Sequence, residues 1–427
     1  MNIDAGRASL HQIHLDKEGA NLGLWYINGK EKFIHFPSGM ILNDATCDNY
    51  LREHQYSFKK GDKSLSEGQA KKLEIRRGYR LDGVVEQCGW RMAGAHLTKN
   101  DHFILVLKGP SRIKPFEGSW VAINTLLHAA FPDDRERHLF LSWVALAVQG
   151  FYGSRPQLPG QILALVGSGC EIIQTLIAGV LGSNVVNPFG YSLEKNQHPV
   201  ELFEACAWSI DPDSIFQGSK TEKNRFREFV ACCQAPELEY RSRLSGSFRM
   251  PLFVRGNAAF KWHARCVRPL ADYIFEFHEE LIVLPCTAGS ASDQAFPEEE
   301  LPAFIWHLLS EYKFLNELRA PRFGLTGYFS NEVKNLCWVG TVEYEICVGL
   351  EKIAGNKKEI EEADIPGELE FAGITRTQIS RILRVKPLSV IMETLSEKFP
   401  HCVVPKPTKN RRVWKLNFKS FDVDEAF

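Results

Sequence analysis

A glycine-rich turn between an apolar strand and an apolar helix is the segment whose residue types could bind a phosphate. The strand-like QILALVG runs into Gly167, Ser168 and Gly169, and the helical CEIIQTLIAGVLG follows. A phosphate-binding P-loop needs G-x-x-x-x-G-K-[ST], in which glycine amides face the phosphates, the lysine neutralises them and the hydroxyl ligates Mg²⁺. This turn is too short, and Cys170 and Glu171 stand where the lysine and the hydroxyl are required. We expect either a remnant of a nucleotide-binding turn or a tight turn without a ligand.

Strands and helices alternate around this turn. Strands are predicted at 161–166, 207–211 and 252–255, with helices at 171–181 and around 224–233 between them. This order implies parallel strands joined by helical crossovers. The first helix is expected to pack on the sheet through Ile172, Leu176 and Val180.

Further helices are predicted on both sides of this core. Two lie within 119–150, the second of them after a Pro132-Asp133-Asp134 start signal, and 298–318 is expected to be helical with Trp306 and Leu309 on one face.

Residues 1–110 are typical of a small α+β region. A hairpin is predicted at 24–34 with Asn28-Gly29 as its turn, and a buried strand at 102–108. The segment 59–80 carries eight basic and three acidic side chains. It is expected to be a solvated helix and loop or a phosphate-contacting surface.

The segment from 336 to 427 changes character. The predicted order is a helix (342–353), an acidic spacer (359–370), two helices (375–383 and 387–399) and two strands (402–404 and 413–418) joined by PKPTKNRR. That is the order of a winged helix. Between 375 and 419 eleven basic side chains face two acidic ones, which favours contact with nucleic acid over a purely solvated wing or a protein-docking surface. The residues expected to contact nucleic acid are Arg376, Gln378, Arg381, Lys406, Lys409, Arg411, Arg412 and Lys415.

From about 103 to 418 the chain resembles the primase-helicase-associated ATPase family of phages and mobile elements, in the superfamily 3 branch of AAA+ proteins. The resemblance is carried, in order, by FILVLKGPSRIKPFEGSW, LSWVALAVQG, PGQILALVG with IIQTLIAGVLG, SIDPD, VRGN, LPAFIWHLLSEYKFLNELRAPRFG and the winged-helix tail.

The resemblance implies roles for residues beyond the turn. Asp211 and Asp213 are similar to the acidic pair that binds Mg²⁺ and activates water, but Pro212 occupies one of the two matching positions. Asn257 matches the sensor residue after the third strand. Turn and helix-cap roles are the alternative for all three residues. The cations that could act in trans or face DNA are Arg241, Arg243, Arg249 and Arg255.

Composition excludes several classes. The 427 residues are 44% hydrophobic and 24% charged, which excludes global disorder, and the net charge of −1 confines any nucleic-acid surface to part of the molecule. No apolar run approaches the roughly 20 residues that span a bilayer, and the start of the chain has no secretory signal pattern. The eleven cysteines form no C-x-x-C pair, so reduced thiols in a cytoplasmic protein are expected, without a zinc site.

These features together predict an α/β protein with three parts. They are an α+β region at 1–110, a degenerate AAA+-like, P-loop-like parallel sheet with helices at 111–335, and a winged helix at 336–427. The function expected is nucleic-acid binding or scaffolding, DNA rather than RNA, in a phage or mobile-element replication or defence assembly. The alternatives are a divergent DNA-dependent ATPase, the only one that needs ATP and Mg²⁺, and a protein-interaction adaptor. Protein partners and a homo-oligomer are compatible with each.

Overall fold

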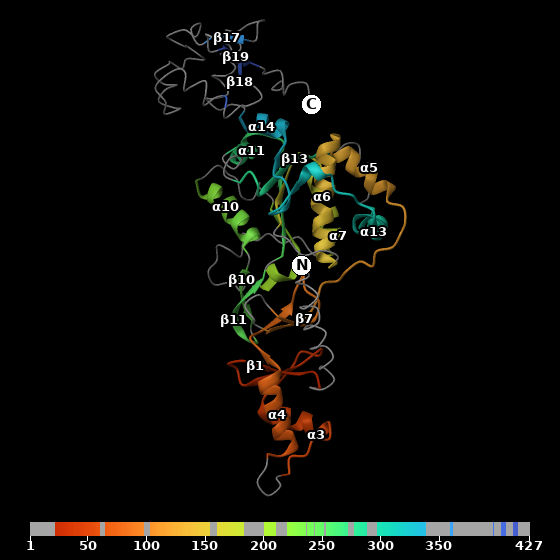
Figure 1. Ribbon diagram of the computed structural model, residues 1–427, viewed down its shortest axis with the longest axis vertical. Helices are drawn as coiled ribbons and strands as arrows, with labels where there is room; N and C mark the ends of the chain where they lie inside the picture. The colour runs from red at the N-terminus through yellow and green to blue at the C-terminus, as the bar shows by residue number, and fades with distance from the viewer. Residues whose placement is uncertain are drawn as a thin grey trace.

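The computed structural model describes most of the chain up to residue 338 and short segments beyond it. The described residues are 22–59, 65–97, 103–153, 160–182, 200–210, 220–235, 237–242, 244–251, 253–271, 277–287, 297–338, 359–361, 396, 403–406 and 413–416. The molecule is elongated, with the first helices at one end, a parallel sheet in the middle and three late strands at the other end (Figure 1).

A five-stranded parallel sheet forms the centre of the fold. Its order is β16 (Tyr328–Phe329), β13 (Leu281–Pro285), β8 (Ile162–Val166), β12 (Arg255–Phe260) and β9 (Ala207–Ile210). All four neighbouring pairs are parallel, which confirms the predicted α/β sheet. Every residue of β8, β9 and β13 is buried, as expected where helices cover both faces.

The third predicted strand is displaced along the sequence. The apolar run at 252–255 was expected to form it, but β12 is the small-residue stretch RGNAAF, and Met250 and Pro251 end another strand, β11 (Gly246–Pro251). Packing explains the difference, because a Cβ on Gly256 would lie 2.7 Å from the sulfur of Cys233. Only a very small residue fits between the sheet and the helix above it.

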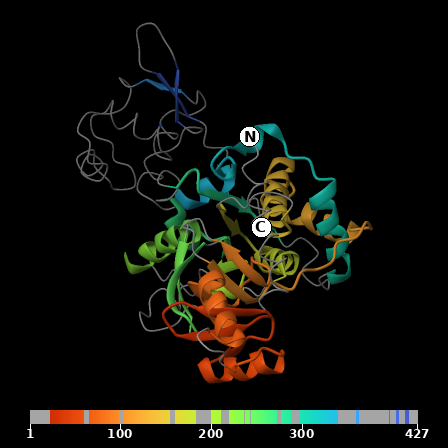
Figure 2. The same cartoon turned by 60° about the horizontal axis from the view of Figure 1, so that its bottom comes forward.

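Helices cover both faces of the sheet. In both views α6 and α7 lie on one side and α10 on the other (Figures 1 and 2). The Asp133 carboxylate accepts a hydrogen bond from the Glu136 amide at 3.0 Å, which confirms the predicted helix start. The helices of this region are α5 (Val121–Ala130), α6 (Asp134–Phe151), α7 (Cys170–Leu181), α9 (Val200–Glu204), α10 (Lys220–Gln234), α11 (Ala264–Ala271), α13 (Leu301–Ser310) and α14 (Asn331–Trp338).

Two helix predictions need correction. In α7 the buried face includes Ile173 and Ile177 beside Leu176 and Val180, whereas Ile172 is only half-buried. The predicted helix at 298–318 is broken into a short 3₁₀ turn η3 (Glu298–Glu300), α13, and a second 3₁₀ turn η4 (Asn316–Leu318), followed by β14 (Arg319–Ala320) and β15 (Gly324–Leu325). Trp306 and Leu309, which were predicted to share one face, are only half-buried. The buried face of α13 carries Phe304, Ile305 and Leu308.

Two small sheets build the N-terminal part. One has the order β3 (Met40–Leu42), β2 (Lys32–His35), β1 (Leu24–Ile27) and β4 (Arg80–Leu81). The antiparallel pairing of β1 with β2 confirms the predicted hairpin, with a connection of four residues from Asn28 to Glu31.

The second small sheet has two packed faces. Its order is β5 (Gly83–Gln87), β7 (Phe103–Lys108) and β6 (Gly94–Leu97), and β7 confirms the predicted buried strand. Leu105 on β7 belongs to the N-terminal core, whereas Ile104 and Val106 belong to the core of the central sheet. Because side chains alternate along a strand, this sheet joins the two cores.

A hairpin of the central region also reaches this sheet. It consists of β10 (Glu237–Ser242) and β11, and both views place it beside the N-terminal strands (Figures 1 and 2). The Ser245 hydroxyl accepts a hydrogen bond from the Val84 amide at 2.8 Å. A Cβ added to Gly83 would lie 2.5 Å from the nearest atom of the Phe248 ring, so this ring packs directly against the glycine.

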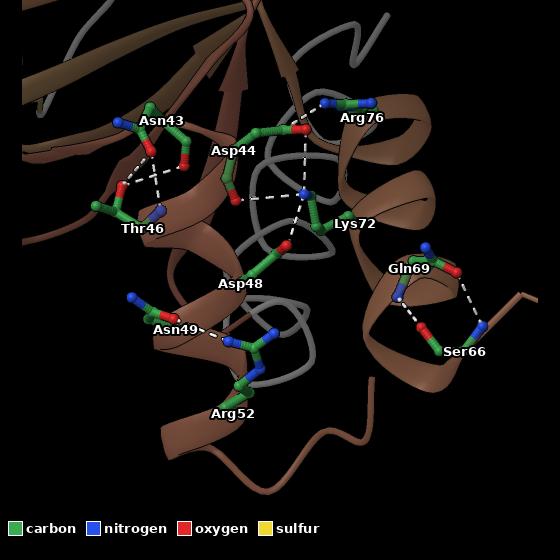
Figure 3. Close-up of polar contacts among 10 residues, drawn as sticks. All are labelled: Asn43, Asp44, Thr46, Asp48, Asn49, Arg52, Ser66, Gln69, Lys72 and Arg76. Atoms are coloured by element: carbon green, nitrogen blue, oxygen red, sulfur yellow. Dashed lines mark hydrogen bonds and ion pairs between the residues drawn. The ribbon is translucent and has the colours of Figure 1, made fainter. Parts of the chain in front are cut away.

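Two cations of the basic stretch at 59–80 are used inside the fold. It forms α4 (Glu67–Gly78), which packs beside α3 (Asp44–Glu53). The Lys72 ammonium lies 2.7 Å from Asp48 and 3.3 Å from Asp44, and Arg76 also pairs with Asp44 (Figure 3). These two cations join α4 to α3, whereas Lys59, Arg77 and Arg80 of the same stretch are exposed. The phosphate-contacting interpretation therefore loses Lys72 and Arg76 only.

Three strands are described in the C-terminal segment. They are β17 (Glu359–Glu361), β18 (Val403–Lys406) and β19 (Val413–Leu416), in the order β17, β19, β18, all antiparallel. The pairing of β18 with β19 confirms the predicted strand pair. The predicted acidic spacer instead begins with a strand, since β17 pairs with β19 from Glu359↔Lys415 to Glu361↔Val413. The predicted helices 342–353, 375–383 and 387–399 lie outside the described residues, except for Ser396, which is helical.

Candidate functional site

The glycine-rich turn is short and tightly packed. Strand β8 ends at Val166 and helix α7 begins at Cys170, so three residues connect them. Gly167 has a φ of +140°, and a Cβ there would lie 2.0 Å from the carbonyl oxygen of Cys286. The glycine is therefore required for the turn to pass the end of β13.

Two amides of this turn donate to backbone carbonyls. The Gly167 N–H donates to the Phe260 carbonyl at 2.8 Å, and the Gly169 N–H donates to the Cys286 carbonyl at 3.0 Å. In a P-loop such glycine amides point at the phosphates. Here they tie the turn to the ends of the two strands beside β8. Ser168, between them, is exposed.

Glu171 and two buried cysteines, Cys170 and Cys286, are the ionisable side chains at the turn. Glu171 is exposed in the first turn of α7, where its carboxylate suits the helix N-terminus and repels a polyphosphate. The hydrogen bond with Cys170, together with burial, raises the pKa of the Cys286 thiol well above its usual value. The Cys286 thiol is therefore neutral at pH 7 and a weak nucleophile.

A buried polar cluster lies beneath the turn. Asn257 was expected after the third strand but lies inside β12, in register with Leu163 and Ser209, and is fully buried. Its Oδ1 accepts hydrogen bonds from the Ser209 hydroxyl at 2.6 Å and the Gln174 amide at 2.8 Å. Its Nδ2 has no partner within the described part of the chain. This cluster connects α7, β12 and β9.

Sequence reasoning missed Gln174 and Ser209. The available signal was a polar residue beside apolar ones in each of two segments, Gln174 in EIIQTLIAG and Ser209 in AWSI. A polar side chain at a position that periodicity assigns to the core needs a hydrogen-bond partner. The pattern alone does not say which one.

The structure brings together only part of the predicted site. Asp211 and Asp213 lie outside the described residues, directly after the end of β9. Arg241 and Arg249 lie on the β10–β11 hairpin, where Arg241 pairs with Glu239 at 3.3 Å. Arg255 is the first residue of β12, at the amino ends of the parallel strands, whereas the turn lies at their carboxyl ends. Arg243 is outside the described residues, as are Arg376, Gln378, Arg381, Lys409, Arg411 and Arg412.

Lys406 and Lys415 lie in β18 and β19. Within the described ranges no three His, Cys, Asp or Glu side chains are grouped to hold a metal ion. None of the helices described here is long and apolar enough to cross a bilayer.

No family model matches the chain, and no curated protein does. Three solved structures of the apo NrS-1 C-terminal region align with nearly all of it. One is 12% identical over 96% of this chain and 98% of that chain, with a TM-score of 0.50. Two A-form structures are 13% identical over 96% of this chain and 99% of theirs, with TM-scores of 0.49 and 0.47. At this identity the alignment with a TM-score of 0.50 indicates a similar fold and carries no information on ligand or activity.

Proposed function

We propose that the chain is a superfamily 3-like AAA+ protein that has lost ATP hydrolysis and serves as a nucleic-acid-binding or scaffolding component of a phage or mobile-element replication or defence assembly. The observation that carries this proposal is the bonding of the glycine turn. A phosphate would need the same N–H groups through which Gly167 and Gly169 donate hydrogen bonds to the carbonyls of Phe260 and Cys286. Breaking those bonds costs about 1 kcal/mol each, and no lysine in the turn compensates.

The sheet order supports AAA+ ancestry. Strand β12 lies between β8, which leads into the turn, and β9, which leads to Asp211. In AAA+ ATPases an added strand likewise separates the P-loop strand from the strand that carries the acidic pair. The environment of the sensor-like Asn257 is consistent with loss of activity. Its buried Oδ1 already accepts hydrogen bonds from the Ser209 hydroxyl and the Gln174 side-chain amide.

The C-terminal strands support a basic winged helix. Strand β17 precedes the two predicted helices and pairs with β19, the last strand of the predicted wing. A three-stranded sheet in that order suits a winged helix. The basic residues predicted around the wing, Arg411 and Arg412 among them, would then contact phosphates.

Nucleotide binding provides the first test. Amide hydrogen exchange of Gly167 and Gly169 should be slow in the free protein and unchanged by ATP with Mg²⁺, and ATP turnover should be negligible with and without DNA. ATP turnover that disappears in Asp211→Ala and Asp213→Ala would instead establish the divergent ATPase.

Salt dependence provides the second test. Counterion release makes the log–log slope of affinity against salt about −0.9 for each duplex phosphate neutralised. The double variant Arg411→Ala, Arg412→Ala should flatten that slope by about 2 and should weaken binding to unrelated DNA sequences equally. Arg322→Ala, at an exposed arginine of the central region, is the matched control. If the full chain binds neither DNA nor RNA at low salt, the adaptor function replaces this one.

A further inference from the structure

Four exposed cations surround the end of the first N-terminal sheet at which β1 is connected to β2. Lys30 belongs to this connection, and Lys32 is the first residue of β2. Arg80 is the first residue of β4, in register with Tyr26 of β1, and Arg77 lies in the last turn of α4. All four side chains are exposed. We call these four residues the tip cations.

The Arg80 guanidinium is held in place by a neutral group. It donates a hydrogen bond to Oδ1 of Asn28, which begins the connection that carries Lys30. Asn28 in turn donates from Nδ2 to Asp82 at 3.3 Å, and the second oxygen of Asp82 accepts from the Phe103 amide at 3.0 Å. The amide of Asn28 therefore fixes the position of the arginine without neutralising its charge.

The stem of Lys30 is also fixed. Its backbone N–H donates to the Ile27 carbonyl at 3.3 Å, which closes the turn. A Cβ added to Gly246 of β11 would lie 3.9 Å from the Cε of Lys30, so the β10–β11 hairpin flanks the stem. A lysine can pack its methylene groups in this way and keep its ammonium in water.

Other cations of α4 are neutralised by carboxylates. Lys71 pairs with Glu74 at 3.0 Å, and Lys72 and Arg76 pair with carboxylates of α3 (Figure 3). None of the tip cations forms an ion pair within the part of the chain that the structure describes. Their charge is therefore available to a partner.

Two carboxylates accompany the tip cations. Glu31 lies in the same connection and is exposed, and Asp82 is half-buried behind Asn28. The surface therefore keeps an excess of two positive charges. Exposed lysines and arginines that come from separate elements and lack carboxylate partners are the groups that contact the backbone phosphates of nucleic acids.

We propose that the tip cations bind the phosphate backbone of a nucleic acid, at a surface separate from the predicted winged helix. Arginine can donate two hydrogen bonds to one phosphate, and lysine acts as a point charge. Because the contacts are with phosphates, binding should not depend on base sequence. The surface needs neither the glycine turn nor the C-terminal segment, so it does not rest on the proposed function.

The test is a lysine footprint of the full chain. Accessible lysines are acetylated with and without a mixed-sequence oligonucleotide, either single-stranded or duplex, and mass spectrometry measures the modification at each position. Nucleic acid should protect Lys30 and Lys32, and the form that protects more strongly identifies the partner. Lys108 and Lys313, which are exposed elsewhere on the molecule, should react equally in both samples. Protection of Lys409 reports separately on the winged helix.

Salt dependence gives the magnitude. The double variant Lys30→Gln, Lys32→Gln should flatten the log–log slope of duplex affinity against salt by about 2, since each duplex phosphate neutralised contributes about 0.9. The double variant Lys108→Gln, Lys313→Gln makes the same change in charge and should behave as wild type.

Three results would overturn the proposal. The first is unchanged reactivity of Lys30 and Lys32 in the presence of nucleic acid, even if Lys409 is protected and the winged helix is thereby supported. The second is a slope that is the same in wild type and in Lys30→Gln, Lys32→Gln. The third is equal protection of the two lysines by polyglutamate at the same ionic strength, which would identify an acidic protein as the partner.

Discussion

Glu136 is a buried carboxyl that should make this protein less stable as pH rises from about 4.5 to 6. It lies on α6 and is only 6% exposed, and the Tyr328 hydroxyl donates to its Oε1 at 3.2 Å. Burial is the main cause that raises its pKa, from 4.5 to about 6. Hydrogen bonds from Ser330 and Tyr328 lower it, and the carboxylates of Asp133 and Glu332 raise it.

The magnitude follows from linkage. One pKa unit is worth about 1.4 kcal/mol, so a change from 4.5 to about 6 corresponds to about 2 kcal/mol. Below pH 4.5 the carboxyl is protonated in both states and costs nothing. Between about pH 4.5 and 6 the unfolded chain releases this proton and the folded chain keeps it, so unfolding becomes easier as pH rises. Above pH 6 the loss is complete and constant.

Glu136→Gln isolates this effect. The amide oxygen can still accept from Tyr328, and the group no longer ionises. In urea unfolding, the stability of the variant minus that of wild type should rise by about 2 kcal/mol between pH 4 and pH 7. Glu228→Gln, at an exposed position on α10, should show almost no such rise. A difference that stays flat or falls with pH for Glu136→Gln would refute the reasoning.

Three further predictions concern stability, each measured by chemical denaturation. Gly167→Ala should cost more than about 2 kcal/mol, because its Cβ would lie 2.0 Å from a backbone oxygen, whereas Gly78→Ala, with nothing within 4 Å, should be tolerated. Asp48→Asn should cost about 1–3 kcal/mol by leaving the nearly buried Lys72 ammonium with a single, more exposed partner, while Glu74→Gln on the outer face of α4 should cost less than about 0.5. Ser66→Ala should cost about 1 kcal/mol by removing the capping box of α4; equal stability to wild type would contradict this.

The sequence alone was sufficient where structure depends on neighbouring residues. The short apolar run ILALV before the glycines predicted a strand followed by a turn and a helix, and β8 and α7 have this order. The start of α6 was also predictable, because the Asp133 carboxylate caps it by accepting a hydrogen bond from the Glu136 amide three residues later. The missing lysine of the turn is likewise visible without any structure.

Tertiary structure decided what depends on distant parts of the chain. That β12 is RGNAAF follows from the narrow space under α10, which Gly256 alone fits. The use of the turn's amides by Phe260 and Cys286, and the burial of Asn257, need the neighbouring strands in place. Local patterns record which side chains avoid water, but not which distant groups meet, because that is fixed by sheet order and packing.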